Sequence, residues 1–353
     1  MPCRPAISSH SLGRAWVHKL PEKLDQAARY GFDVEMFYED IQYLARTLPG
    51  GENRETIIAA AHVARMLCSE RGISIICLQP FMHYEGLRDR RKHKERVEEM
   101  KLWIELAQAL NTHLISIPST CLSSEEVSGD MGLIVQDLQE IAELGRREGI
   151  QFAYESLAWG TYADTWEQSW EIVKQVDRPN FGLCLDTFNI AGRVYADPTS
   201  STRKTNNAER DMTASLDRLV RTVDVSKIAY VQVVDAEYLE DPLVEGHQFY
   251  DAEQPARMSW SRNCRLFYGE SDRGAYLPIK AILKAILVDL QFQGWVSAEL
   301  FNRSLTDSSP EVPSEHARRA AISWQRILDD LDLKDSCKEV DKTCHEQGPR
   351  AQL

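Results

Sequence analysis

The sequence predicts a single (β/α)8 TIM barrel of the α/β class, and three observations indicate this fold. Short β-rich runs alternate with longer amphipathic segments along nearly the whole chain. No glycine-rich nucleotide-binding motif follows the first strand, which disfavours a doubly wound sheet. The length of 353 residues suits one large barrel domain. The strongest rival is an open α/β sheet with a helical cap.

Eight strands are expected where short apolar and β-branched runs lie between turn residues. They cover residues 5–8, 32–36, 73–78, 114–117, 151–155, 181–186, 228–234 and 295–300. Eight strands spread in this way use almost the entire chain, as one barrel requires.

Amphipathic patterns between these strands predict eight helices. They cover residues 20–30, 54–71, 94–110, 132–148, 166–176, 212–223, 278–289 and 315–331. Several stop at a glycine, as at Gly31, Gly72 and Gly149, because glycine readily adopts the left-handed conformation that ends a helix.

Two stretches interrupt the alternation. The connection from Val234 to Pro278 is too long for a simple loop, and its Tyr, Trp, Arg and His residues suit a functional cover. From residue 335 the chain is polar and uneven, which predicts a disordered tail. We therefore expect a barrel over residues 1–334, with a long loop after the seventh strand, and a tail over residues 335–353.

Charge and composition disfavour several classes of protein. There are 41 Lys and Arg against 54 Asp and Glu, and a net charge of -13 disfavours binding to nucleic acid. No apolar run is long enough to span a membrane, and the first residues lack the apolar core of a signal peptide. The eight cysteines are scattered without a CxxC pair, as is typical of free thiols. We expect a cytoplasmic protein without nucleic-acid or membrane partners.

Polar residues end four consecutive apolar strands, the fifth to the eighth. They are Glu155, Asp186, Gln232 and Glu299. A barrel brings strand ends to one mouth, and three carboxylates buried there would resist joint ionisation. A divalent cation resolves the repulsion, and oxygen ligands suit Mg, Mn or Co. The alternative is that these residues form ordinary salt bridges around the barrel rim.

Longer segments around these residues resemble a known family. YESLAWG, FGLCLDTFNIAGR, YVQVVDAE, QPARMSWSRNCRLFYGE and WVSAELFNRSL are similar to segments of the fungal 3-dehydroshikimate dehydratases of quinate catabolism, within the xylose-isomerase-like superfamily of metal-dependent barrels. The resemblance runs from about residue 7 to residue 331.

The resemblance implies a hydro-lyase that converts 3-dehydroshikimate to protocatechuate and water. It implies a divalent metal held by the four strand-end residues. A metal that chelates the ring ketone and the adjacent hydroxyl would stabilise an enediolate, a Lewis-acid effect generally worth several kcal/mol.

The carboxylate of such a substrate needs a cationic anchor. Arg262 and Arg265, with Ser261 as a hydroxyl donor, lie in the long loop after the seventh strand. Arg90 follows the third strand and is another candidate. Arginine offers two parallel donors to a carboxylate. Pairing of these arginines with surface acids is the alternative, and for Arg90 the two interpretations are evenly balanced.

Candidates for the catalytic step are Asn189 and His247. Bacterial members of the superfamily tend to have a histidine three residues after the metal-binding Asp, where this chain has Asn189. An amide cannot act as a general base, but Asn189 could orient the substrate by hydrogen bonds. His247 shares the long loop with the arginines and is favoured as the base over His83, which follows the third strand.

Other functions on the same barrel remain open. A metal-dependent sugar isomerase or epimerase would use Glu155 and Glu299, but a neutral sugar offers Arg262 and Arg265 no anion to bind. An endonuclease-like phosphodiesterase would need a mouth rich in histidine, and a binding barrel without activity would not need the four ligands. We expect a small anionic substrate, 3-dehydroshikimate, and consider a homodimer.

Overall fold

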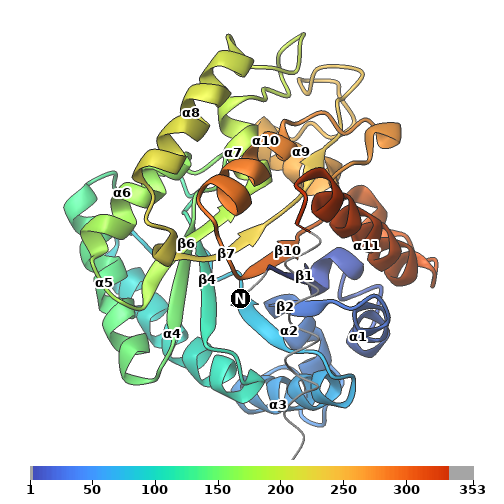
Figure 1. The fold of residues 1–353 in the computed structure, drawn as a ribbon. Coiled ribbons are helices and arrows are strands. Elements are labelled where there is room, and N and C mark those ends of the chain that lie inside the picture. Colours follow the sequence, from blue (N-terminus) through green and yellow to red (C-terminus); the bar gives the residue numbers. More distant parts are fainter. Residues whose placement is uncertain (1–2, 334–353) are drawn as a thin grey trace, which may run out of the picture.

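The computed structural model describes residues 3–333, and its centre is a closed barrel of eight parallel strands (Figure 1). Their order around the barrel is β1-β10-β7-β6-β5-β4-β3-β2. The strands are β1 (Arg4–Ser8), β2 (Asp33–Phe37), β3 (Ile75–Gln79), β4 (Leu114–Pro118), β5 (Gln151–Glu155), β6 (Phe181–Asp186), β7 (Ile228–Gln232) and β10 (Trp295–Ala298). The predicted TIM barrel is confirmed, and the open sheet is wrong.

Helices form a ring around the strands, as Figure 1 shows. They are α1 (Leu20–Arg29), α2 (Tyr38–Arg46), α3 (Arg54–Glu70), α4 (Arg90–Leu110), α5 (Met131–Arg147), α6 (Trp166–Val176), α7 (Thr187–Val194), α8 (Ala208–Thr222), α9 (Ala256–Cys264), α10 (Ile279–Leu283) and α11 (Val312–Asp330). The sequence did not predict α2, α7 and α9. The helix expected over residues 278–289 consists of α10 and a π-helical segment, Lys284–Asp289.

The alternation of side chains along the strands positions the polar residues. Ala153 and Cys184 belong to a small buried cluster that is separate from the main core. Neighbouring residues such as Phe152 and Leu183 belong instead to the main core that the helices share. Since side chains on a strand alternate between its two faces, the residues two positions after Ala153 and Cys184, which are Glu155 and Asp186, share their face.

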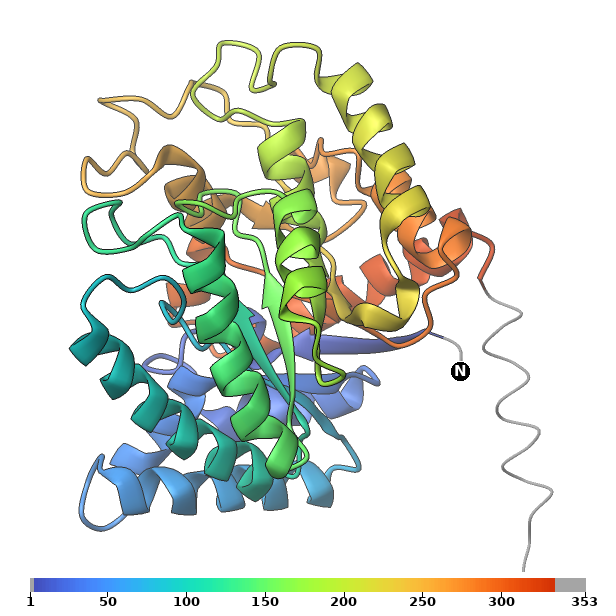
Figure 2. The same cartoon turned by 90° about the vertical axis from the view of Figure 1, so that its left-hand side faces the viewer.

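The connection after β7 folds back over the barrel. It contains a two-stranded antiparallel sheet of β8 (Asp235–Ala236) and β9 (Arg265–Leu266), with α9 between the two strands. The carboxylate of Asp235 accepts hydrogen bonds from the backbone N–H groups of Tyr276 and Leu277, which ties the end of the connection to its start. In Figure 2 this connection lies at the end of the barrel opposite the N-terminus.

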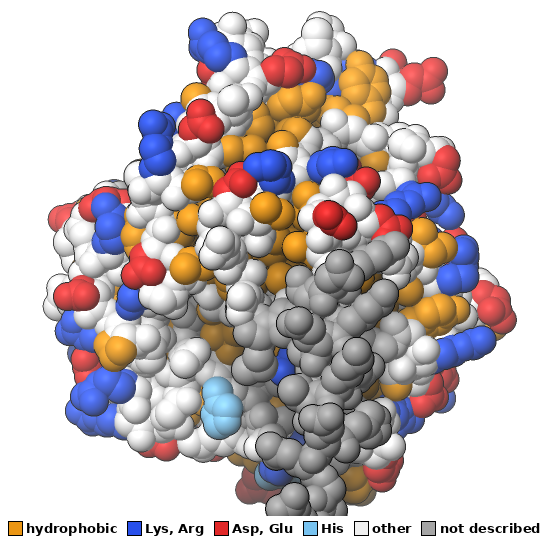
Figure 3. Space-filling model, in the orientation of Figure 1, with side chains coloured by type: hydrophobic (Ala, Val, Ile, Leu, Met, Phe, Trp, Pro, Cys, Tyr) orange, Lys and Arg blue, Asp and Glu red, His pale blue; other side chains and the backbone are white. Residues whose placement is uncertain are grey.

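Surface charge, cysteines and helix lengths bear on the classes of protein that the sequence disfavours. On the face shown in Figure 3, basic and acidic side chains are interspersed. Cys68, Cys77, Cys121, Cys184 and Cys264 are free thiols. No helix in the described part of the chain is long and apolar enough to cross a membrane. The tail predicted over residues 335–353 lies outside the described residues.

Candidate active site

Three carboxylates from three strand ends meet at the mouth of the barrel. Oxygens of Glu155, Asp186 and Glu299 lie within 4.8 Å of one another, and all three residues are buried. We call these residues the carboxylate cluster. Asp186 is also the N-cap of α7, since its Oδ1 accepts a hydrogen bond of 2.8 Å from the N–H of Phe188. Capping orients this carboxylate before any ligand binds.

Gln232 lies at the end of β7 with a fixed amide orientation. Its Nε2 donates to the Oε1 of Glu35 over 2.8 Å, and its Oε1, the atom that could act as a ligand, accepts from the thiol of Cys184 over 3.3 Å. Glu35 itself is held by the hydroxyls of Tyr230 and Ser297, at 2.7 and 2.6 Å. Glu35 is therefore a buried support for Gln232.

Asn189 connects two members of the carboxylate cluster. Its Nδ2 donates to Glu155 Oε1 over 2.7 Å and to Asp186 Oδ2 over 2.8 Å. Its Oδ1 accepts from the N–H of Ala158 at 2.9 Å, which fixes the direction of the amide. Both donor hydrogens of Asn189 therefore face carboxylates, so this side chain positions the cluster.

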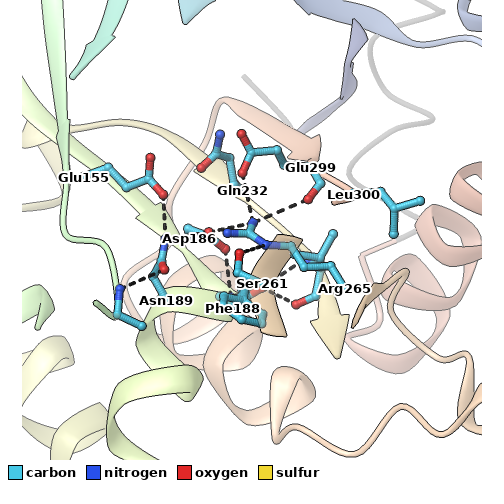
Figure 4. A network of polar contacts seen from close by, with 12 residues as sticks. Glu155, Asp186, Phe188, Asn189, Gln232, Ser261, Arg265, Glu299 and Leu300 are labelled. Atoms are coloured by element: carbon cyan, nitrogen blue, oxygen red, sulfur yellow. Dashed lines mark hydrogen bonds and ion pairs between the residues drawn. The ribbon is translucent and has the colours of Figure 1, made fainter. Parts of the chain in front are cut away.

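Arg265 reaches the cluster from β9, as Figure 4 shows. Its Nη1 lies 3.0 Å from Asp186 Oδ2 and 2.9 Å from Glu299 Oε2, and its Nε donates to Ser261 Oγ over 2.9 Å. The guanidinium also lies over the rings of Phe188 and Phe301, at 4.4 and 5.1 Å from their centroids. Arg265 is thus a buried counter-charge of the cluster.

Burial and mutual repulsion make this cluster costly. Burial raises the pKa of Glu155 well above its usual range, and the charges of Glu299 and Asp186 raise it further. Burial also raises the pKa of Glu299, while the Arg265 guanidinium acts in the opposite direction. Among the described residues, one guanidinium is bonded to this group of three carboxylates. These oxygen ligands with an unbalanced negative charge fit a divalent cation.

A cavity of about 410 Å³ reaches the cluster, since Glu155, Glu299 and Arg265 form part of its wall. The sequence candidates Ser261 and Arg262 also line it, as does Trp159. The remaining lining residues are Arg14, Phe37, Gln79, Pro80, Met82, Pro118, Leu157, Met258 and Phe301.

Other candidates lie outside this wall. The Nη2 of Arg90 lies 2.5 Å from the carboxylate of buried Asp137, so Arg90 already has a partner. The Nδ1 of His247 accepts a hydrogen bond from the N–H of Phe249 at 3.1 Å. His83 contacts Thr120 at 3.4 Å. The functional roles suggested for Arg90, His247 and His83 stay predictions that the cavity does not support.

Two polar residues of the wall were not among the sequence candidates. Gln79, at the end of β3, donates from Nε2 to Glu299 Oε1 over 2.9 Å. Its position at a strand end was a signal that the sequence offered. Arg14 follows β1 in a loop, where no periodic pattern distinguished it from other surface arginines.

Fold and site together define a barrel whose buried oxygen ligands could hold a metal ion, and comparison with known proteins gives the family. The family model "Xylose isomerase-like TIM barrel" matches residues 24–328. The chain belongs to this family, and its relatives place it with the 3-dehydroshikimate dehydratases. The enzyme of that name from Neurospora crassa is 53% identical over 341 residues, which cover 94% of this chain and 95% of the relative.

A more distant relative carries the same name, and solved structures share the fold. A 3-dehydroshikimate dehydratase from Pseudomonas putida is 30% identical over 80% of this chain, which covers 36% of that longer protein. A solved fusion protein of a xylose isomerase-like TIM barrel and 4-hydroxyphenylpyruvate dioxygenase has a TM-score of 0.72 at 26% identity, covering 96% of this chain and 45% of its own. The zinc-bound IOLI protein has a TM-score of 0.65 at 18% identity, covering 93% and 98%, and shows the shared fold.

Proposed function

We propose that this chain is a hydro-lyase that converts 3-dehydroshikimate to protocatechuate and water. The observation that carries the proposal is the buried carboxylate cluster, whose Glu155 and Glu299 form part of the wall of a cavity that arginines also line. The cavity thus offers a site for a cation and, beside it, groups that bind an acid. The 53% identity to the N. crassa enzyme over nearly the full length of both chains supports this substrate.

The residues proposed to hold a divalent cation are Glu155, Asp186, Gln232 and Glu299. A cation bound there would supply Lewis-acid stabilisation of negative charge that develops on substrate oxygens. Mg, Mn or Co suits this ligand set. The IOLI protein binds a zinc atom, so zinc is a further ion to test.

The chain itself prepares the site before the substrate enters. Asn189, Gln79 and Glu35 hold the proposed ligands in place through the hydrogen bonds described above. Phe37, Phe301 and other apolar wall residues exclude water from bound substrate. Exclusion of water strengthens each electrostatic contact inside the cavity. The assignment of a proton-transfer group to His247 or His83 stays a prediction.

A direct assay tests the function. Purified protein is incubated with 3-dehydroshikimate and Mg, Mn, Co or Zn, while the ultraviolet absorbance of the aromatic product is followed. We expect product that requires a divalent metal and disappears with a chelator. Absence of product with every metal would refute the dehydratase. Turnover of neutral ketose sugars in its place would favour the isomerase or epimerase alternative.

A further inference from the structure

Arg14 lies in the loop after β1 and lines the same cavity as the carboxylate cluster. Its backbone is fixed, because its N–H donates to the carbonyl of Leu305 over 3.0 Å and its own carbonyl accepts from Val17 and His18. The residue is half-buried. Its side chain therefore begins from a defined position and ends at the cavity.

The guanidinium of Arg14 has unused hydrogen-bonding capacity. Its Nε is buried without a hydrogen-bond partner, and no carboxylate within the described part of the chain lies within ion-pair distance. The guanidinium carbon lies 5.2 Å from the ring centroid of Trp16, a contact that satisfies no donor. A buried donor without an acceptor is costly, and a ligand acceptor would remove that cost.

Arg262, on α9, lines the cavity with Arg14. Its Nη1 donates to the side-chain carbonyl of Gln254 over 2.8 Å, a neutral acceptor. Burial lowers the pKa of Arg14, the carboxylate of Glu39 opposes that effect, and the charge of Arg262 lowers it further. Two like charges that face one cavity repel each other, and an anion between them would reverse that repulsion.

We propose that Arg14 and Arg262 together bind the carboxylate of the substrate, with Arg14 as a specificity-determining residue. This inference rests on the proposed function and deepens it, since it assigns the two ends of the substrate. The ring ketone and adjacent hydroxyl of the substrate face the carboxylate cluster, and the substrate carboxylate faces the two arginines. Arg265 is committed to Asp186 and Glu299, which leaves Arg14 and Arg262 as the cavity-lining arginines available to an anion.

The test compares two ligands that differ by one carboxylate. Protocatechuate and catechol share the ring and its two hydroxyls, so the ratio of their dissociation constants isolates the carboxylate. We expect the wild-type protein with Mn to prefer protocatechuate. Arg14→Ala should weaken protocatechuate roughly 10–100-fold, the range for a lost hydrogen bond to a charged group, and leave catechol unchanged. Isothermal titration calorimetry measures all four constants.

Three further variants separate binding from folding. Arg14→Lys keeps the charge and should restore part of the preference. Glu39→Gln removes the carboxylate whose charge raises the pKa of Arg14, and it should leave the ratio of the two dissociation constants unchanged. Arg54→Ala removes an exposed arginine that is paired with Glu105 outside the cavity, as a matched control.

The outcomes are distinct. In turnover assays, Arg14→Ala should raise the KM for 3-dehydroshikimate far more than it lowers kcat. An unchanged ligand ratio in Arg14→Ala, equal weakening of both ligands, or the same effect in Glu39→Gln would overturn the inference. If the wild-type protein lacks dehydratase activity but its preference for protocatechuate depends on Arg14, the proposed function fails and the carboxylate site stands.

Discussion

The two charged ends of the cavity are built in different ways. The carboxylate cluster is buried, comes from the ends of β5 and β6 and the residue after β10, and is held by buried partners such as Asn189 and Arg265. The arginine pair, Arg14 and Arg262, comes from a loop and from α9, and Arg262 is exposed. The barrel fixes the positions of residues at strand ends. Loop side chains, by contrast, find their hydrogen-bond partners when a ligand binds.

This difference predicts unequal consequences of substitution. Loss of a residue from the carboxylate cluster should remove the metal and hence the chemistry, while loss from the arginine pair should weaken substrate binding. Arg14→Ala, described above, tests the arginine pair. Substitutions at four buried positions in and around the cluster test the other side of the contrast, and they are taken in order of decreasing effect.

Glu299→Gln should cause the largest loss of activity. The substitution keeps the shape of the side chain and removes a negative ligand, so we expect kcat/KM to fall at least about 1,000-fold. Calorimetric titration with Mn should show weaker binding, while circular dichroism shows an intact fold. Glu105→Gln, on the outer surface, is the control. Activity near the wild-type level would show that Glu299 is not a ligand.

Glu85 tests the cost of a buried carboxylate outside the cluster. Its Oε1 accepts from the N–H of Thr120 and the hydroxyl of Tyr154, at 2.7 and 3.0 Å, while its Oε2 is buried without a partner. Burial raises the pKa of Glu85 from 4.5 to about 7. The folded state thus prefers the protonated acid, so the stability it contributes is present below pH 4.5 and is lost as the pH rises through 7.

Glu85→Gln should therefore flatten the pH dependence of unfolding. Relative to this variant, the wild-type protein should lose at most about 3 kcal/mol between pH 4.5 and pH 8, as a pKa shift of this size implies. Urea denaturation at several pH values measures the difference. Parallel pH profiles for the two proteins would contradict the role of burial at Glu85.

Asn189→Ala removes the amide that bridges Glu155 and Asp186. Without its hydrogen bonds, two proposed ligands lose their orientation, and we expect roughly 10–100-fold weaker binding of Mn. If Asn189 instead orients the substrate, metal affinity should stay unchanged and KM should rise. Calorimetry with Mn, combined with steady-state kinetics, distinguishes these two roles.

Arg265→Met should have the smallest effect on metal binding and the opposite sign. Removal of the guanidinium leaves the cluster more negative, so we expect Mn to bind about tenfold more tightly. Turnover should nevertheless fall, since Ser261, Asp186 and Glu299 lose their shared partner. Weaker metal binding in this variant would show that Arg265 supports the ligand geometry more than it opposes the cation.

Sequence reasoning located the strands well because their apolar runs carry a strong signal. β5 and β6 have the predicted bounds, and the polar residues Glu155 and Asp186 followed from them. It missed α7 and α9, whose short patterns lie beside strands and inside a long loop. Arg14 could not be distinguished, because its place at the cavity depends on tertiary packing of the loop against Leu305.

The resemblance to the 3-dehydroshikimate dehydratases came from ordered segments, and the comparisons confirm it. The chemistry of the residues in these segments then predicted their roles in binding metal and substrate.

Arg265 was expected to bind the substrate carboxylate, yet the structure places its guanidinium between Asp186 and Glu299. Spacing along the chain could not reveal this, because the antiparallel pairing of β8 with β9 sets the position of Arg265.

The most direct test of the central claim is a titration of chelated, metal-free protein with Mn, followed at once by calorimetry and by formation of protocatechuate. We predict one tightly bound ion per chain, with activity that rises in proportion to occupancy and reaches its limit at one equivalent. Full dehydratase activity in metal-free protein, or Mn binding that Glu299→Gln leaves unchanged, would contradict the claim that the carboxylate cluster holds the catalytic metal.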